Sequence, residues 1–241
     1  MTALWIPELT SEPNWFPAPQ SALSEPDGLL AFGGDLSVAR LRQAYQQGIF
    51  PWFSDGDPLL WWSPSIRAVF APESLRAGRS LWRDWQKQQY HFSCNQAFAD
   101  VVMGCAAPRP NQPSTWITKE IQQAYQRLHQ AGVAHSLEVW QQDKLVGGLY
   151  GIQVGHLFCG ESMFNRVPNA AKLALVQLQH YLQSFQLGWI DCQMPNPFLL
   201  QCGARPLPRP DYLELLQKLS ALPVPDALWQ SGPLPAMIKP R

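Results

Sequence analysis

Two short runs in the second half of the chain each place a carboxylate among apolar, strand-like residues. Glu161 follows Gly160 in the run 158–164, and Asp191 lies in the run 188–193. A carboxylate in a half-buried strand is costly unless it has a partner or a chemical task. Two such carboxylates, one on each side of a helical stretch, therefore indicate a functional site.

Asp191 and Gln193 are two residues apart, so on a strand their side chains would share one face. An ionised Asp and a Gln carbonyl are both hydrogen-bond acceptors, and together they suit a donor-rich cation such as an ammonium. A structural alternative stays open, in which Asp191 ends its strand and accepts hydrogen bonds from neighbouring backbone N–H groups. The alternative for Glu161 is an ion pair with Arg166 across a turn.

The remaining reactive residue types point to structural roles. Cys192 lies between Asp191 and Gln193, so it should face the other way and belong to the core. His135 is typical of a structural histidine on a strand. The five cysteines are scattered without a CxxC pair, and no HExxH or Walker-type motif is present. We therefore expect no disulfide framework, no metal site and no phosphate-binding loop.

Composition predicts a globular chain with a substantial core, because 46% of the 241 residues are hydrophobic. Lys+Arg and Asp+Glu both number 18, so net charge favours no polyanionic partner. A local basic patch exists between Arg67 and Lys87, although a solvated helix face explains it equally well. Scattered cysteines, the absence of a signal-peptide pattern and the absence of a membrane-length apolar run predict a cytoplasmic protein without a membrane partner.

Periodicity and capping residues predict a mixed α+β fold. We expect a helix from the cap at 35–37 to Gly48, a strand and a basic helix over 67–91, and helices over 95–107 and 118–132. Three antiparallel strands follow at 136–140, 144–151 and 155–163, then a helix capped by Asn169 and a strand over 189–193. Prolines 108, 110 and 113 predict a boundary between domains 1–110 and 111–241.

Several long blocks carry a family resemblance over roughly residues 14 to 212. They are residues 25–36, 44–53, 60–64, 115–118, 134–136, 145–151, 160–164 and 191–193. In sequence and order these blocks resemble the leucyl/phenylalanyl-tRNA–protein transferases. The resemblance implies a C-terminal domain with an acetyltransferase-like (GNAT-type) mixed sheet and a smaller N-terminal α/β domain.

The resemblance also implies an activity and its partners. The enzyme would be an aminoacyltransferase that moves Leu or Phe, and also Met, from aminoacyl-tRNA to the N-terminal α-amine of proteins beginning with Arg or Lys. That modification marks proteins for N-end-rule degradation. No cofactor is implied. Nothing in the sequence demands a dimer, so we expect a monomer.

Matching positions give the implied site residues. Asp191 and Gln193 would activate the acceptor amine, and Glu161 would contact the substrate amine. The aminoacyl side-chain pocket would consist of Leu149, Met163, Leu175, Leu178, Leu182 and Ile190. The implied tRNA contacts are Trp52 and Trp116, which would stack on the terminal adenine, with Tyr45, Arg79, Arg83 and Lys87. We expect Trp82, Asp84 and Trp85 to interrupt the basic face.

Two features bear on mechanism and on competing functions. The family commonly has His where this chain has Phe198, so a mechanism that needs that His as a proton carrier would fail here.

One alternative function is that of an acetyl-CoA-dependent N-acetyltransferase. The turn 165–169 contains no glycine to cradle a pyrophosphate, which counts against it. The other is a non-catalytic tRNA-binding protein, which would need neither the carboxylates nor an apolar pocket.

Overall fold

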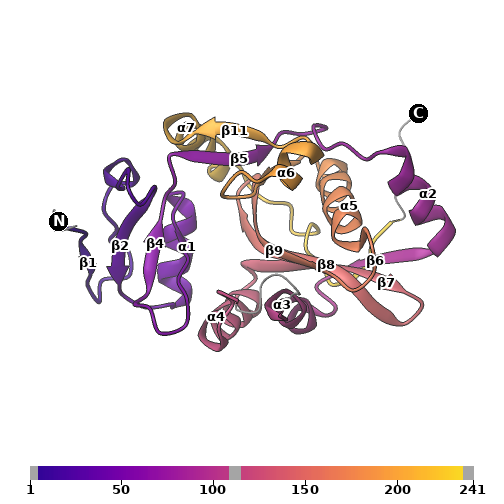
Figure 1. Ribbon diagram of the computed structural model, residues 1–241, viewed down its shortest axis with the longest axis horizontal. Coiled ribbons are helices and arrows are strands. Elements are labelled where there is room, and N and C mark those ends of the chain that lie inside the picture. The colour runs from indigo at the N-terminus through magenta and orange to yellow at the C-terminus, as the bar shows by residue number, and fades with distance from the viewer. Residues whose placement is uncertain (1–4, 109–114, 236–241) are drawn as a thin grey trace.

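The computed structural model describes residues 5–108 and 115–235. It contains two β-sheets, the smaller of which lies at the N-terminal end (Figure 1). The smaller sheet has the order β1-β2-β4-β3. Its elements, with the neighbouring helices, are β1 (Glu8–Leu9), η1 (Pro19–Ser21), β2 (Leu29–Gly33), α1 (Val38–Gln46), β3 (Phe50–Pro51) and β4 (Leu60–Trp62).

The larger sheet has eight strands in the order β11-β5-β10-β9-β8-β7-β6-β12. Its neighbouring strands run antiparallel except for β9 and β10, which are parallel. The strands are β5 (Ile66–Phe70), β6 (Tyr90–Cys94), β7 (Ala134–Gln141), β8 (Lys144–Val154), β9 (Leu157–Asn165), β10 (Trp189–Asp191), β11 (Arg205–Pro208) and β12 (Gly232–Pro233). The predicted meander and the predicted mixed α+β class are confirmed.

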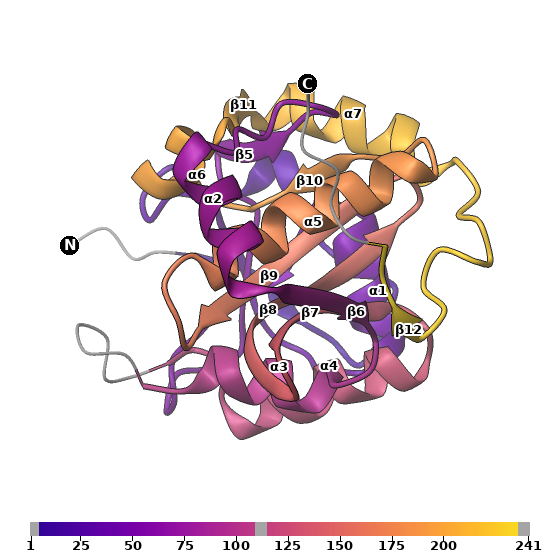
Figure 2. The same cartoon turned by 90° about the vertical axis from the view of Figure 1, so that its right-hand side faces the viewer.

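Helices cover both faces of the larger sheet (Figures 1 and 2). Helices α3 (Phe98–Ala106) and α4 (Lys119–Gln130) pack on one face, and α5 (Ala170–Ser184) packs on the other. The remaining helices are α2 (Arg79–Gln88), α6 (Pro197–Cys202) and α7 (Arg209–Ser220). Because side chains alternate along a strand, Leu149 and Tyr150 of β8 enter different cores. None of the helices in the two described ranges could cross a membrane.

Local capping explains where two of the predicted helices begin. The Ser37 hydroxyl accepts from the backbone N–H of Arg40 at 3.2 Å, and the Thr118 hydroxyl accepts from that of Ile121 at 3.3 Å. Asn169 is the N-cap residue of α5, as predicted, but its side chain makes no capping hydrogen bond. Asn169 has φ of 68°, and its side chain instead donates to Asp84 at 2.7 Å.

The first part of the chain contributes to both sheets. It builds the small sheet, and it also supplies β5, β6 and α3 to the larger layer. Strand β5 is largely buried and pairs with β10 on one side and β11 on the other. The domain boundary expected between residues 110 and 111 lies outside the described residues.

The C-terminal segment 221–235 crosses from the end of α7 to the opposite edge of the larger sheet, where β12 pairs with β6 (Figure 2). Several hydrogen bonds hold it. The Tyr181 hydroxyl donates to the carbonyl of Leu228, and the Asn95 side chain donates to that of Trp229 at 2.8 Å. This segment therefore fixes β6 relative to α5 and adds β12 as the edge strand.

Candidate active site

A cavity of about 460 Å³ opens where β9 and β10 separate. The two strands pair only as far as Cys159 and Asp191. Strand β9 continues to Asn165, whereas the chain leaves β10 at Asp191 and turns towards α6. Residues 160–163 and 193–196 line the gap. The end of a strand pair thus creates the opening without an extra loop.

The apolar walls of this cavity include most of the residues expected to hold an aminoacyl side chain. Five of them line it, namely Leu149, Met163, Leu175, Leu178 and Ile190. Leu182 does not, because it lies one turn beyond Leu178 on α5, where it is fully buried in the core. Phe158 and Leu199 also line the cavity and were not predicted.

Glu161 projects from a β-bulge. Tyr150 pairs with Ser162, but Gly151 pairs with Gly160, so Glu161 is the extra residue of β9. Its Oε2 accepts from the Tyr125 hydroxyl at 2.6 Å, and its Oε1 accepts from Gln193 Nε2 at 2.7 Å. The alternative pairing of Glu161 with Arg166 is wrong, since Arg166 donates to the Leu145 carbonyl.

The charge of Glu161 is balanced between burial and hydrogen bonding. Burial raises its pKa to about 7, against the lowering effect of the hydroxyls of Tyr125 and Tyr45. The two tyrosine hydroxyls are 2.5 Å apart, so they form a buried cluster behind the carboxylate. Glu161 can therefore change its charge near neutral pH, as groups that exchange protons with substrates commonly do.

Asp191 does not line the cavity. It is fully buried, forms an ion pair with Arg67, and accepts from the Tyr212 hydroxyl at 3.0 Å. Its Oδ1 also accepts from the backbone N–H of Gln193 at 2.9 Å. The structural alternative, in which Asp191 ends its strand and accepts a backbone N–H, is thus confirmed. The Arg67 and Tyr212 partners were not predicted.

Gln193 reaches the cavity by a turn rather than by strand alternation. Strand β10 ends at Asp191, and Gln193 has φ of 60°. Asp191 and Gln193 therefore do not share a strand face. Cys192 packs against the core, as expected, and also lines the cavity. Burial and the nearby Asp191 carboxylate raise the pKa of its thiol, so Cys192 is a neutral wall residue rather than a thiolate.

The aromatic residues expected to contact tRNA lie away from the cavity walls. Trp52 is 39% exposed, with its ring against the edge of Trp62 at 5.5 Å between centroids. Trp116 is half-buried and packs on the core that includes α3 and α4. Tyr45 is buried, and its hydroxyl belongs to the cluster behind Glu161 rather than to an exposed face.

The basic face of α2 is continuous. Arg79, Arg83 and Lys87 are all exposed, and their spacing of four residues places them on one side of the helix. The expected interruption by tryptophans is wrong, because Trp82 is buried and Trp85 packs beside it at 5.8 Å between ring centroids. Asp84, the third residue expected to interrupt this face, accepts from the Asn169 side chain at 2.7 Å. Burial of the aromatic face turns the cations towards solvent.

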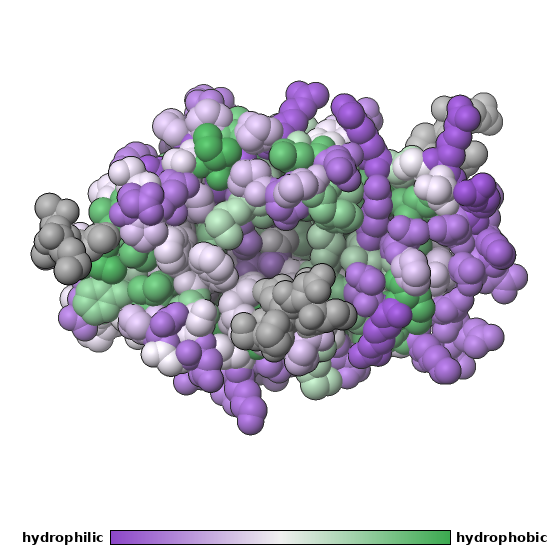
Figure 3. Space-filling model, in the orientation of Figure 1, coloured by the Kyte–Doolittle hydropathy of each residue, from purple (hydrophilic) through white to green (hydrophobic). Residues whose placement is uncertain are grey.

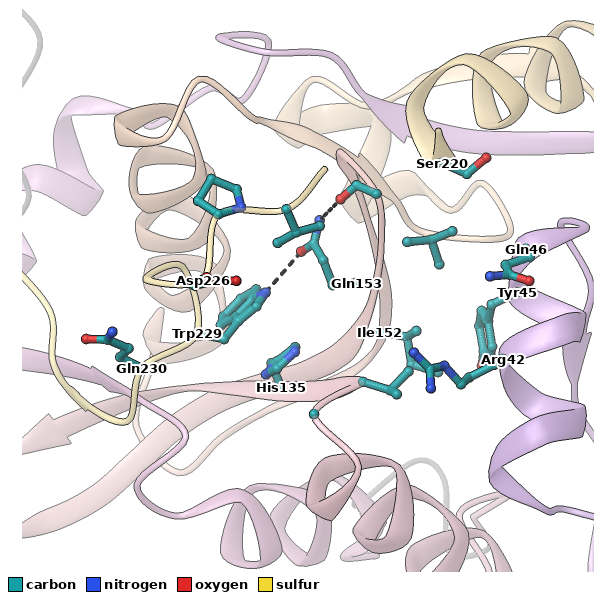
Figure 4. A pocket seen from close by; sticks show the side chains of 16 residues that line it. Arg42, Tyr45, Gln46, His135, Ile152, Gln153, Ser220, Asp226, Trp229 and Gln230 are labelled. Carbon is teal, nitrogen blue, oxygen red and sulfur yellow. Dashed lines mark hydrogen bonds between the residues drawn. The ribbon is translucent and has the colours of Figure 1, made fainter. Parts of the chain in front are cut away.

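A second cavity, of about 500 Å³, lies between α1, the β7–β8 strands and the C-terminal segment (Figure 4). His135 stacks on Trp229 there, with 4.4 Å between ring centroids. Burial lowers the His135 pKa to about 3, so this histidine is neutral and structural, as predicted. Trp229 donates to Gln153 at 3.2 Å and holds the C-terminal segment on the sheet.

Neither cavity is built around metal ligands. Within residues 5–108 and 115–235, no group of three or more His, Cys, Asp or Glu side chains could hold a metal ion. All five cysteines are free. The polar residues that line the first cavity include Glu161 and Gln193, whose carboxylate and amide suit an amine ligand.

Known proteins match the chain along most of its length. The model of the leucyl/phenylalanyl-tRNA protein transferase family matches residues 69–217, and that of its N-terminal domain matches residues 34–65. The leucyl/phenylalanyl-tRNA–protein transferase of Shewanella woodyi is 52% identical over 92% of this chain and 94% of its own. That of Shewanella loihica is 51% identical over 89% and 91%.

Similarity to solved structures is weaker. The structure of L-PGS from Bacillus licheniformis has a TM-score of 0.39 at 8% identity, over 70% of this chain and 54% of that chain. A likeness at this level carries no conclusion about fold or function. The family models and the curated relatives show that the chain belongs to the leucyl/phenylalanyl-tRNA–protein transferase family and is an aminoacyltransferase.

Proposed function

We propose that this enzyme transfers Leu or Phe, and also Met, from aminoacyl-tRNA to the N-terminal α-amine of proteins beginning with Arg or Lys. It would act in the cytoplasm as a monomer and mark those proteins for N-end-rule degradation. Family membership supports the donor and the reaction. The observation that carries the proposal is an apolar cavity with Glu161 and Gln193 joined at its wall. The antiparallel strands, α5 and the parallel strand β10 are compatible with a GNAT-type arrangement.

The donor side chain occupies the apolar part of the cavity. Leucine and isoleucine walls with the flexible Met163 fit an unbranched or γ-branched chain and disfavour one branched at Cβ. Apolar pockets discriminate by only about 1–3 kcal/mol per methylene. Leu, Phe and Met are therefore accepted together, with modest preferences among them.

Glu161 and Gln193 receive the amine. Gln193 donates through Nε2 to Glu161, which leaves its carbonyl oxygen to accept an N–H. The Glu161 carboxylate supplies the second acceptor. An N-terminal amine has a pKa of about 8, so an appreciable fraction is already neutral at pH 7. Glu161 and Gln193 together orient the lone pair of the amine nitrogen. Asp191 acts through Gln193, whose backbone N–H it holds.

The reaction is aminolysis of an ester. The amine nitrogen attacks the carbonyl carbon, the C–N bond forms, and the bond from that carbon to the ribose oxygen breaks. One amine proton passes to the departing ribose oxygen. Holding ester and amine together supplies most of the acceleration for such a step. On the tRNA side, Trp52 and Trp116 would stack on the terminal adenine, and Arg79, Arg83 and Lys87 would contact phosphates.

Transfer from charged tRNA tests the proposal directly. We expect radiolabelled Leu or Phe to appear on a protein beginning with Arg and not on the same protein beginning with Ala. Glu161→Gln and Gln193→Ala should each reduce transfer at least tenfold. The exposed Glu214→Gln, which breaks only a surface pair with Lys218, should have no effect. Label on neither protein, with acetyl transfer from acetyl-CoA instead, would refute the proposal.

A further inference from the structure

Exposed apolar side chains lie on the segment that runs from Met194, at the wall of the active-site cavity, into α6. Among the described residues, nine large hydrophobic side chains are exposed, and three of them fall within residues 194–200. These are Met194, Phe198 and Leu200, which are 40%, 41% and 42% exposed. Hydrophobic residues are visible over α6 on the face shown in Figure 3. The proposed mechanism assigns no role to these three residues, which together are called the rim.

The short helix α6 forces the rim side chains outward. Its first turn is capped by Asn196, whose Oδ1 accepts from the backbone N–H of Leu199 at 2.9 Å. Leu199 lines the cavity and is buried, as is Cys202. Phe198 and Leu200 flank Leu199 by about 100° on either side of the helix. With Leu199 turned inward, both neighbours are held at the surface.

We propose that this rim binds apolar side chains at the second and third positions of the acceptor protein. The inference rests on the proposed function. The acceptor amine must reach Gln193, and Met194 follows Gln193 directly while also lining the cavity. An extended chain advances about 3.3 Å per residue, so the residues after the first pass over the rim.

The composition of the rim favours a polypeptide over the tRNA. Residues 194–200 contain no Lys or Arg, whereas contacts with a nucleic-acid backbone depend on cations. Two prolines, Pro195 and Pro197, add rigid apolar surface between the exposed side chains. The rim therefore adds a specificity that lies beyond recognition of the first residue.

Matched peptides test the proposal. We compare kcat/KM for peptides beginning Arg-Leu-Leu and Arg-Ser-Ser, with the same charged tRNA as donor. The wild-type enzyme should prefer the apolar peptide about three- to tenfold, as expected for a partly exposed apolar site. The double variant Phe198→Ser/Leu200→Ser should bring that ratio near one and leave the KM for aminoacyl-tRNA unchanged. The control Leu222→Ser, at a residue 42% exposed beyond α7, should keep the wild-type ratio.

Two results would refute the proposal that the rim binds the acceptor protein. One is an equal ratio in the wild type and the double variant; the other is a variant whose defect lies only in the KM for aminoacyl-tRNA. Absence of transfer to either peptide by the wild type would instead refute the proposed function, and the rim proposal with it.

Discussion

At the scale of single residues, the site depends on what sets the ionisation state of the buried Glu161 carboxylate. Glu161 is 9% exposed, and burial alone favours its neutral form. Hydrogen bonds from Tyr125 and Gln193 favour the ionised form, and Tyr45 extends the cluster from α1. The Asp191 carboxylate raises the Glu161 pKa and the Arg67 guanidinium lowers it. The hydroxyls are thus the adjustable part of the balance.

Tyr125→Phe should shift the pH dependence of transfer to higher pH. The variant loses a donor to the Glu161 carboxylate, so the pKa rises above its value of about 7. The proposed role of Glu161 needs its ionised form, so activity should be lost as pH falls through that pKa. We expect the acidic limb of kcat/KM to move up by about half a unit to one unit. Measurement of kcat/KM between pH 6 and 9 checks this.

The control for that experiment is Tyr90→Phe on β6, three strands away from β9. The titration of the acceptor amine belongs to the peptide and is the same for every variant, so it cannot mimic the shift. An unchanged acidic limb in Tyr125→Phe would mean that a group other than Glu161 governs the profile.

At the scale of elements, several predictions from the sequence held because their determinants are local. The Ser37 and Thr118 caps and the apolar spacing of Ile121, Ala124 and Leu128 lie within a few residues of the helices they specify. Strands β7 to β9 follow from alternation and short turns. The partners of Glu161 could not be predicted in this way. Tyr125 reads as a core residue by spacing, and its hydroxyl partner lies 36 residues away.

The turn at Gln193 shows a second limit. Alternation assigned its side chain to the face of Asp191, but the strand ends first and a left-handed backbone conformation redirects the chain. Gln193 still reaches Glu161. Likewise Arg67 belonged to a basic run in the sequence, and only the pairing of β5 with β10 brings it to Asp191. Long-range pairing, rather than local pattern, selected these contacts.

The basic face of α2 carries a prediction for tRNA binding. Arg83→Glu should raise the KM for aminoacyl-tRNA and reduce the slope of log KM against log salt by about one, as expected for one lost phosphate contact. The control Arg42→Glu changes an exposed cation on α1 that lines the second cavity. Equal slopes for the wild type and Arg83→Glu would remove α2 from the tRNA path.

At the scale of the whole molecule, one buried cluster joins parts of the chain that are distant in sequence. Arg67 of β5 pairs with Asp191 of β10 and donates to the Gly48 carbonyl after α1 at 3.3 Å. Its guanidinium lies 4.4 Å from the Tyr212 ring of α7 and 5.0 Å from that of Phe50. The small sheet, the larger sheet and α7 therefore meet at a single cation directly behind the turn at Gln193.

This arrangement predicts that substitutions of Asp191 and of Gln193 have different effects on the free energy of unfolding. Asp191→Ala leaves Arg67 buried without its counter-charge, which should cost about 3–5 kcal/mol of unfolding free energy. The double variant Asp191→Ala/Arg67→Met should recover part of that loss, because no unpaired charge remains. Gln193→Ala removes a half-buried side chain and should cost about 1 kcal/mol or less while still reducing transfer. Urea unfolding of the three variants gives the free energies. If Asp191→Ala were as stable as Gln193→Ala, the ion pair would not hold the site together. A loss of transfer in Asp191→Ala would then indicate that Asp191 contacts the reacting amine directly.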